Sequence, residues 1–164
     1  MYKLGHINLN IDIKEIKSFK YTREPLNLQE EDKWETGVYN GMTFGGELYS
    51  GKNYIPEWTK QISKDLNMKD CGYSFYKMKT NNIIPTHVDH YSTYTKIFKK
   101  NIKDVVRAIV FLENWKSGHY FEVDGFPVSN WKAGDYCMWT HSVPHFAANI
   151  GIEDRYTLQI TGVN

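Results

Sequence analysis

The C-terminal half of the sequence repeats one pattern, in which short runs of alternating or β-branched residues are separated by turn-forming residues. Five runs have this character: YSFYKMK, VVRAIVFLEN, HYFEVDG, DYCMWT and RYTLQITG. Successive side chains of a strand point to opposite faces, so the alternation predicts strands with two distinct faces. Turn signals lie between the runs, at Lys116–Gly118, Asp124–Pro127, Lys132–Gly134 and Asn149–Asp154. Short strands at this spacing predict an antiparallel sandwich or barrel.

A jelly roll, the cupin-like double-stranded β-helix, fits these strands best, although periodicity alone supports a generic β-sandwich almost as well. One helix is predicted before the strands. Pro56 suits a first helical turn, and Trp58, Ile62 and Leu66 recur on one side of IPEWTKQISKDLN. The predicted fold class is therefore mainly β with a few helices (α+β).

The N-terminal region is predicted to support this core as a helical and loop segment. Ile7, Leu9, Ile11 and Ile13 alternate with other residues, which predicts that they share one face of a strand. Residues 22–53 are polar and rich in glycine, and we interpret them as loops with short strands.

The chain has 164 residues, which is enough to bury a core without disulfides. We expect a single domain over 1–164. Residues 1–70 would supply the N-terminal strand, the loops and the supporting helix, and residues 71–164 the jelly-roll core, which also contains the candidate site residues described below. The formal net charge of +1 argues against a nucleic-acid partner.

The basic cluster Lys96–Lys103 is interpreted first as a solvated loop and second as a lip for an anionic substrate. Cys71 and Cys137 lack the CxxC spacing of zinc and redox motifs. The start of the chain shows no signal-peptide pattern, and no apolar stretch is long enough to span a bilayer. These observations predict a cytoplasmic protein without a membrane partner.

The segment IPTHVDH contains the first candidate metal ligands, His87 and Asp89. Residues two apart on a strand point to the same face, so an imidazole and a carboxylate would lie side by side. Alone this signal is weak. A third ligand is available downstream, where His141 and His145 both occur. Two imidazoles and one carboxylate form the facial triad of non-heme iron oxygenases, whereas zinc favours a closed site with more nitrogen or sulfur ligands.

Arg155 begins the run RYTLQIT, ten residues after His145, and shares a polar strand face with Thr157 and Gln159. In a jelly roll with an internal cavity, this polar face can point inward. A buried guanidinium requires an anionic partner, and its planar fork matches a carboxylate. The alternative is that Arg155 lies on a solvated outer face.

The order His87-x-Asp89, then His145, then Arg155 resembles the iron(II)/2-oxoglutarate-dependent dioxygenases, over roughly residues 71–162. The closest likeness is to the prolyl 4-hydroxylase-like branch. VFLENWKSGHYFEV is similar to the strand–turn–strand segment of that branch, and WKAGDYCMWTHSVPHFAANIGIEDRYTLQITG is similar to its C-terminal pattern.

The resemblance implies an enzyme in which His87, Asp89 and His145 hold Fe(II). The His-to-Arg spacing and the PH-aromatic context favour His145 over His141. It also implies that Arg155 and Thr157 bind the far carboxylate of 2-oxoglutarate. Such an enzyme consumes O2, converts 2-oxoglutarate to succinate and hydroxylates a substrate, with ascorbate as a further candidate cofactor.

Tyr76 and Arg107 are two further candidates for contact with the co-substrate. Tyr76 lies near the place where the family often has a tyrosine that reaches 2-oxoglutarate; a packed strand aromatic is the alternative. Arg107 is an arginine in an otherwise apolar run. It would either face the cavity, where it could touch co-substrate or substrate, or pair with Glu113 or Glu122.

The sequence departs from the branch at two places that bear on the substrate. Phe111 stands where a co-substrate tyrosine is common, and His119 replaces a glycine of the usual turn. We expect a peptidyl or free amino acid, such as proline, as the substrate. The alternatives are a nucleobase or small metabolite, or a non-catalytic cupin-type binding module. Residues 22–53 and 91–103 are expected to shape the substrate pocket. No sequence feature indicates an oligomeric state.

Overall fold

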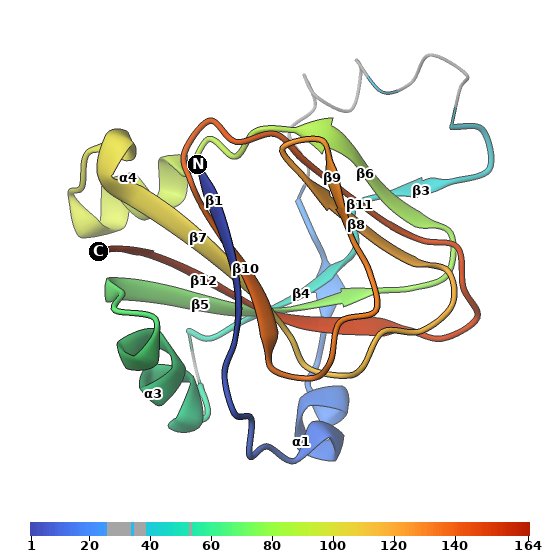
Figure 1. Cartoon of the computed structure of the whole chain (residues 1–164), viewed down its shortest axis with the longest axis horizontal. Helices are drawn as coiled ribbons and strands as arrows, with labels where there is room; N and C mark the ends of the chain where they lie inside the picture. The colour runs from blue at the N-terminus through green and yellow to red at the C-terminus, as the bar shows by residue number, and fades with distance from the viewer. Residues whose placement is uncertain (26–33, 35–38, 53) are drawn as a thin grey trace.

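The computed structural model describes residues 1–25, 34, 39–52 and 54–164, and these form a mainly β structure with a few helices, as predicted. The strands form a seven-stranded and a five-stranded sheet, which face each other across the centre of the molecule (Figure 1). Within this described part, no helix is both long enough and apolar enough to cross a membrane.

The larger sheet has the order β1-β10-β7-β12-β5-β4-β2, and every strand pair in it is antiparallel. Its strands are β1 (Tyr2–His6), β2 (Thr22–Arg23), β4 (Glu47–Ser50), β5 (Lys69–Met78), β7 (Val105–Phe111), β10 (Asp135–Thr140) and β12 (Arg155–Val163). The runs YSFYKMK, VVRAIVFLEN, DYCMWT and RYTLQITG therefore supply four neighbouring strands of one sheet.

The smaller sheet has the order β3-β6-β11-β8-β9, and only the β3–β6 pair is parallel. Its strands are β3 (Thr43–Phe44), β6 (Asn82–His87), β8 (His119–Val123), β9 (Phe126–Val128) and β11 (His145–Asn149). The helices are α1 (Ile13–Ser18), α3 (Trp58–Asp65), α4 (Ser92–Phe98) and the 3₁₀ turn η1 (Ile102–Asp104).

The outer face of the larger sheet packs against α1 and α3. Leu158 and Val110 on this face belong to one apolar cluster with Ile16 of α1 and Ile62 of α3. Trp58 and Leu66 join the same cluster, which confirms the predicted apolar side of the helix. Burial of this face supplies the hydrophobic stabilisation that a helix layer gives to a sheet.

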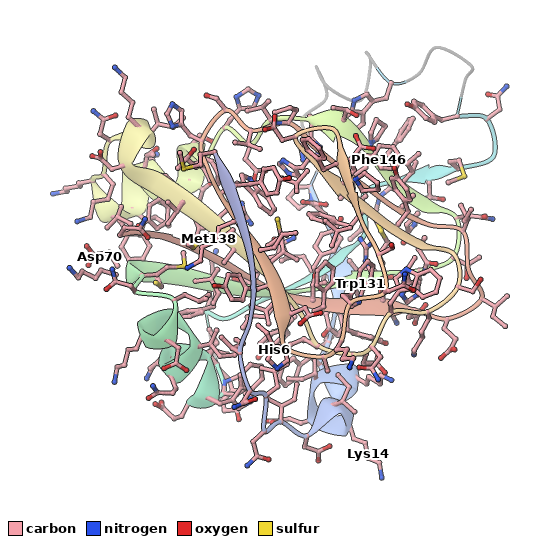
Figure 2. The ribbon with its side chains drawn as sticks, in the orientation of Figure 1. His6, Lys14, Asp70, Trp131, Met138 and Phe146 are labelled. Atoms are coloured by element: carbon pink, nitrogen blue, oxygen red, sulfur yellow. The ribbon has the colours of Figure 1, made fainter. Side chains whose placement is uncertain are left out.

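The inner face of the larger sheet points toward the smaller sheet, and rings fill much of this space. Phe111 stacks on Trp131, which is labelled in Figure 2, with ring centroids 4.0 Å apart. Phe111 also meets Phe121 of β8 edge-on. Trp139 of β10 and Val123 of β8 belong to the same buried cluster. The alternation of β7, β10 and β12 thus separates a helix-covered face from a face that lines the space between the sheets.

The N-terminal prediction was wrong in its secondary structure and correct in its burial pattern. β1 ends at His6, and after the bond from Ile7 N–H to the Gly134 carbonyl the chain leaves the sheet. The Asp12 side chain then accepts a hydrogen bond from the Lys14 N–H and begins α1 at Ile13. The predicted strand is therefore interrupted by a helix cap. All four predicted apolar residues, Ile7, Leu9, Ile11 and Ile13, nevertheless pack against the outer cluster.

The prediction of a solvated loop at Lys96–Lys103 was correct in exposure and wrong in part of the secondary structure. The segment is mostly exposed, but its two ends lie in α4 and η1, and residues 99–101 connect them. Tyr94 and Phe98, four residues apart, stack with ring centroids 4.7 Å apart, and the Tyr94 hydroxyl donates to the Asp70 carbonyl. Packing between these two rings, which are spaced one helical turn apart, stabilises α4, although lysines dominate residues 96–103. The loops with short strands predicted for 22–53 are found where that range is described, as β2, β3 and β4; residues 26–33, 35–38 and 53 lie outside the described residues.

Candidate metal centre

The register of the smaller sheet places two histidines side by side. His87 is the last residue of β6 and His145 the first of β11, and the two are direct partners in the antiparallel ladder. Their ring centroids are 4.2 Å apart. Directly opposite residues on one face of an antiparallel pair are always in contact, so the sheet itself brings the two imidazoles together.

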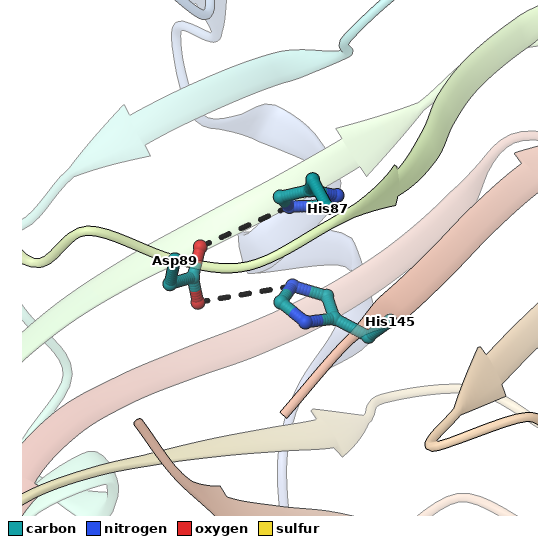
Figure 3. A group of neighbouring side chains, drawn as sticks. All are labelled: His87, Asp89 and His145. Carbon is teal, nitrogen blue, oxygen red and sulfur yellow. Dashed lines mark ion pairs between the residues drawn. The ribbon is translucent and has the colours of Figure 1, made fainter. Parts of the chain in front are cut away.

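Asp89 completes a three-residue group, although it lies beyond the end of β6 rather than on the strand. Its Oδ1 is 3.9 Å from His87 Nε2, and its Oδ2 is 3.8 Å from His145 Nε2 (Figure 3). One ligand atom from each residue lies within 4.8 Å of the others. Among the described residues this is the one group of three or more His, Cys, Asp or Glu side chains so arranged, and His141 is not part of it.

Backbone carbonyls orient both imidazoles. His87 Nδ1 lies 2.9 Å from the Pro85 carbonyl oxygen, and His145 Nδ1 lies 3.1 Å from that of Val143. A carbonyl only accepts hydrogen bonds, so each Nδ1 carries a proton and each Nε2 is the ring nitrogen that faces Asp89. Such outer contacts fix the tautomer and the ring orientation of metal-binding histidines.

The protonation states of the group also suit a cation. Burial alone would raise the pKa of Asp89, but Arg107, His145 and His87 together hold it below its ordinary value. Burial lowers the pKa of His145 to about 4, against an opposing effect of Asp89. At neutral pH the group therefore offers a charged carboxylate and a neutral buried imidazole, the forms in which these side chains bind metals.

The three residues line one wall of a cavity of about 80 Å³ between the two sheets. This is room for several water molecules. Ile84, Phe111 and Phe121 form apolar parts of the wall, and charged side chains from both sheets reach the same space.

Arg155 lines this cavity from the first position of β12, so the predicted inward polar face is confirmed. Its side chain is buried, with 6% of the residue exposed. Nη1 donates to the Tyr120 carbonyl at 2.7 Å and weakly to that of Ala148 at 3.5 Å, and Nη2 lies 2.9 Å from Met78 Sδ. Burial lowers the pKa of Arg155 to about 10.

Arg155 has no carboxylate partner among the residues that the structure describes. Two carbonyls and a thioether satisfy some of its donors but do not neutralise its charge. A buried charge without a counterion is costly, so this environment is typical of a site that receives an anion from outside.

Thr157 and Tyr76 face the cavity beside Arg155. Thr157 is paired with Tyr76 on one neighbouring strand and with Phe111 on the other, so the three side chains form one row across the sheet. All three line the cavity. The Tyr76 hydroxyl donates a hydrogen bond to Glu24, which also lines the cavity.

Glu24 is the charged cavity residue that sequence reasoning missed. It follows β2 in a polar segment, TREPLN, and an acidic residue in a polar segment does not by itself predict a buried site residue. Only the folded chain brings it to Tyr76, because β2 joins the edge of the larger sheet through β4. Burial raises the pKa of the Glu24 carboxyl, although the hydrogen bond from Tyr76 opposes this.

Arg107 faces the cavity and pairs with Asp89 rather than with Glu113 or Glu122. Its Nε is 3.4 Å from Asp89 Oδ2, and its Nη1 donates to Gln159 Oε1 at 2.9 Å. The cavity-facing alternative for this residue is therefore correct.

The two remaining histidines of interest lie outside the three-residue group. His119 is buried, and its Nε2 lies 2.9 Å from the Glu153 carbonyl oxygen. The His141 backbone N–H donates to the Val105 carbonyl, and its Nδ1 is buried without a hydrogen-bond partner in the described structure.

The donor set fits a divalent first-row metal. Two imidazole nitrogens and one carboxylate oxygen converge on one point, the Nδ1 atoms of both rings are hydrogen-bonded, and the open side of the group faces the cavity. This set leaves coordination positions free for other ligands, as in a catalytic rather than a structural site.

The fold is similar to solved structures of the double-stranded β-helix class. A prolyl-4-hydroxylase from Pseudomonas putida matches with a TM-score of 0.56 and 13% identity, over 93% of this chain and 96% of that one. A predicted oxalate decarboxylase from Thermotoga maritima matches with a TM-score of 0.45 and 14% identity, over 72% and 80%. The cupin domain of Schizosaccharomyces pombe Cnp3 matches with a TM-score of 0.44 and 11% identity, over 72% and 61%.

The similarity to the prolyl-4-hydroxylase structure confirms the predicted jelly-roll fold in preference to a generic β-sandwich. At such low identity it establishes the fold alone, because this fold carries many different functions. No protein-family model and no curated protein matches the sequence.

Proposed function

We propose that this protein is an Fe(II)/2-oxoglutarate-dependent dioxygenase that hydroxylates a substrate while 2-oxoglutarate is converted to succinate. The observation that carries the proposal is the position of Arg155. A buried guanidinium without a carboxylate partner lines the same small cavity as His87, Asp89 and His145. A metal-binding module has no need of this unpaired cation. The similar fold of a prolyl-4-hydroxylase supports the same proposal.

The charge balance of the cavity supports a ligand with two negative charges. Arg107 and Arg155 contribute two positive charges, and Asp89 and Glu24 contribute two negative charges when ionised. A bound divalent cation would leave two positive charges without partners. 2-Oxoglutarate is a dianion, so its binding would restore neutrality in a cavity where unbalanced charge is costly.

The residues of the cavity have distinct roles in this proposal. His87, Asp89 and His145 would hold Fe(II), which supplies the activation of O2 and the oxidative chemistry. Arg155 binds and orients the far carboxylate of 2-oxoglutarate with its planar donor fork, and the Thr157 hydroxyl lies two residues along the same face.

Apolar rings close the remaining walls. Phe111 and Phe121 are nearly completely buried, and both line the cavity. They keep water away from the space between the metal ligands and Arg155. Exclusion of water strengthens each electrostatic contact in the site.

Binding of 2-oxoglutarate tests the role of Arg155 directly. In anaerobic calorimetry with the Fe(II)-loaded protein, Arg155→Gln should weaken 2-oxoglutarate binding by about 10- to 100-fold, the cost of losing charge-assisted hydrogen bonds. Arg23→Gln, at an exposed position of β2, is the matched control and should bind like the wild type. Equal affinities of the Arg155 and Arg23 variants, or no binding to the wild type, would contradict the proposal and favour a non-catalytic metal-binding module.

A further inference from the structure

Two charged side chains of the cavity, Glu24 and Arg107, have no task in holding Fe(II) or the far carboxylate of 2-oxoglutarate. They reach the cavity from different strands, Glu24 after β2 and Arg107 on β7. They form no ion pair with each other, although each charge affects the pKa of the other. The cavity therefore presents one cation and one anion that face a shared space.

Arg107 depends on Asp89 for its counter-charge. Its Nε lies 3.4 Å from Asp89 Oδ2 but makes no hydrogen bond of acceptable geometry to any described residue. Metal binding would draw the charge of Asp89 toward the ion. The Arg107 guanidinium would then be left with two uncharged neighbours. These are the Gln159 side chain and the Tyr91 ring, whose centroid is 5.3 Å from Arg107 Cζ.

A second unpaired donor lies beside Arg107. Trp139 is its direct strand partner on β10 and also lines the cavity. The Trp139 residue is 2% exposed, and its Nε1 is buried without a hydrogen-bond partner in the described structure. Buried donors are normally satisfied, so two neighbouring unsatisfied donors indicate that a ligand brings an acceptor, such as a carboxylate.

Glu24 has the opposite requirement. Its carboxylate accepts a hydrogen bond from the neutral Tyr76 hydroxyl, and no described cation forms an ion pair with it. Burial disfavours its charged form. A cationic ligand group at this position would supply both a hydrogen-bond donor and the missing charge.

We infer that the substrate is a free amino acid, bound as its zwitterion with the carboxylate at Arg107 and Trp139 and the ammonium group at Glu24. The inference rests on the proposed function. With Fe(II) on Asp89 and 2-oxoglutarate on Arg155, the remaining charges are one positive and one negative. A zwitterion matches both, whereas a residue within a peptide carries neither terminal charge.

Binding measurements on the wild-type protein test the inference without relying on turnover. Fe(II) and 2-oxoglutarate are added anaerobically, and the visible band of the chelated keto acid reports whether the proposed function holds. The twenty proteinogenic amino acids are then added singly, with binding followed by ligand-observed NMR. At least one should bind, and its N-acetyl and amide derivatives, which each lack one charge, should bind about 10- to 100-fold more weakly.

Two variants assign the charges to residues. Glu24→Gln should lose the discrimination against the N-acetyl derivative, and Arg107→Gln the discrimination against the amide. Glu57→Gln and Arg23→Gln, both at exposed positions, are the matched controls and should discriminate like the wild type. Arg107 is paired with Asp89, so the Arg107→Gln protein is used only if it still shows the visible band with Fe(II) and 2-oxoglutarate. If it does not, the derivative series on the wild type and the Glu24→Gln protein test the inference.

The outcomes separate the two proposals. If the visible band forms but no free amino acid binds, or if the N-acetyl and amide derivatives bind as well as the free amino acid, the inference is overturned and the oxygenase proposal stands. If the band does not form in the folded protein, the oxygenase proposal is contradicted, and the substrate inference that rests on it is overturned with it. Loss of both discriminations in the two named variants would support the zwitterion site.

Discussion

The two faces of strands β7 and β12 have opposite characters, although they are made by alternate residues of the same segments. On the outer face, Val110 and Leu158 are completely buried against the helix layer. On the inner face, Arg107, Arg155 and Thr157 line a cavity with polar side chains, and Arg155 has no ion-pair partner among the described residues.

The difference teaches that stability and function are divided between the faces. The outer face contributes stability by burying apolar surface against the helices. The inner face has a buried guanidinium at Arg155 and unsatisfied donors at Arg107 and Trp139. A protein tolerates such costly groups where a ligand completes them. Substitutions on the two faces should therefore affect different measurements.

The largest expected effect concerns the metal ligands of the smaller sheet. His145→Ala should weaken Fe(II) binding by more than about 100-fold, beyond the range that loss of an outer-shell partner costs, and should abolish 2-oxoglutarate turnover. Binding is measured by equilibrium dialysis and turnover by succinate formation.

His141→Ala is the control for this prediction, because His141 lies near in sequence but outside the three-residue group. It should retain Fe(II) affinity and turnover close to those of the wild type. If His141→Ala is inactive and His145→Ala remains active, the third ligand has been assigned to the wrong histidine.

On the outer face, Leu158→Ala should lower the free energy of unfolding by about 2–5 kcal/mol, because it opens a void in a fully buried cluster. Chemical denaturation measures this change. The neighbouring inner-face variant Thr157→Val should change the unfolding free energy by no more than about 1 kcal/mol, since the side chain keeps nearly the same shape. A similar loss in both variants would contradict the division between the faces.

The pH dependence of stability should show a smaller effect. The folded metal-free protein holds the pKa of His145 at about 4, below its ordinary value of 6.5. Between these values the unfolded chain binds a proton that the folded chain does not, so the unfolding free energy should fall as pH falls. The loss should be on the order of 2 kcal/mol.

Urea denaturation of the metal-free protein at several pH values measures this slope. His145→Gln should flatten the slope, while His141→Gln should leave it as in the wild type. An unchanged slope in His145→Gln would mean that the burial of this imidazole does not control the acid sensitivity of the fold.

The features that could be predicted from sequence are those with a strong local period. Alternation in RYTLQITG predicted both the strand β12 and its inward polar face, and the apolar spacing of Trp58, Ile62 and Leu66 predicted the side of α3 that is buried. The histidines could be nominated because their residue types and order are informative, and the ladder then places His87 opposite His145.

The features that could not be predicted depend on contacts between distant segments. Glu24 enters the cavity only because β2 pairs with β4 at the edge of the larger sheet. Arg107, on the larger sheet, is paired with Asp89, which follows β6 of the smaller sheet. The helix α4 was obscured by the lysines at and after its C-terminal end, which mask the packing of Tyr94 on Phe98. Such contacts have no local pattern in the sequence.

The most direct test of the central claim is an anaerobic absorbance titration of the metal-free protein with Fe(II) and then with 2-oxoglutarate. We predict that a weak visible charge-transfer band appears in the wild type, requires both additions, weakens in Arg155→Gln and is lost in His145→Ala. If the folded wild-type protein shows no band after both additions, the cavity does not hold a chelated keto acid on iron, and the oxygenase proposal is contradicted.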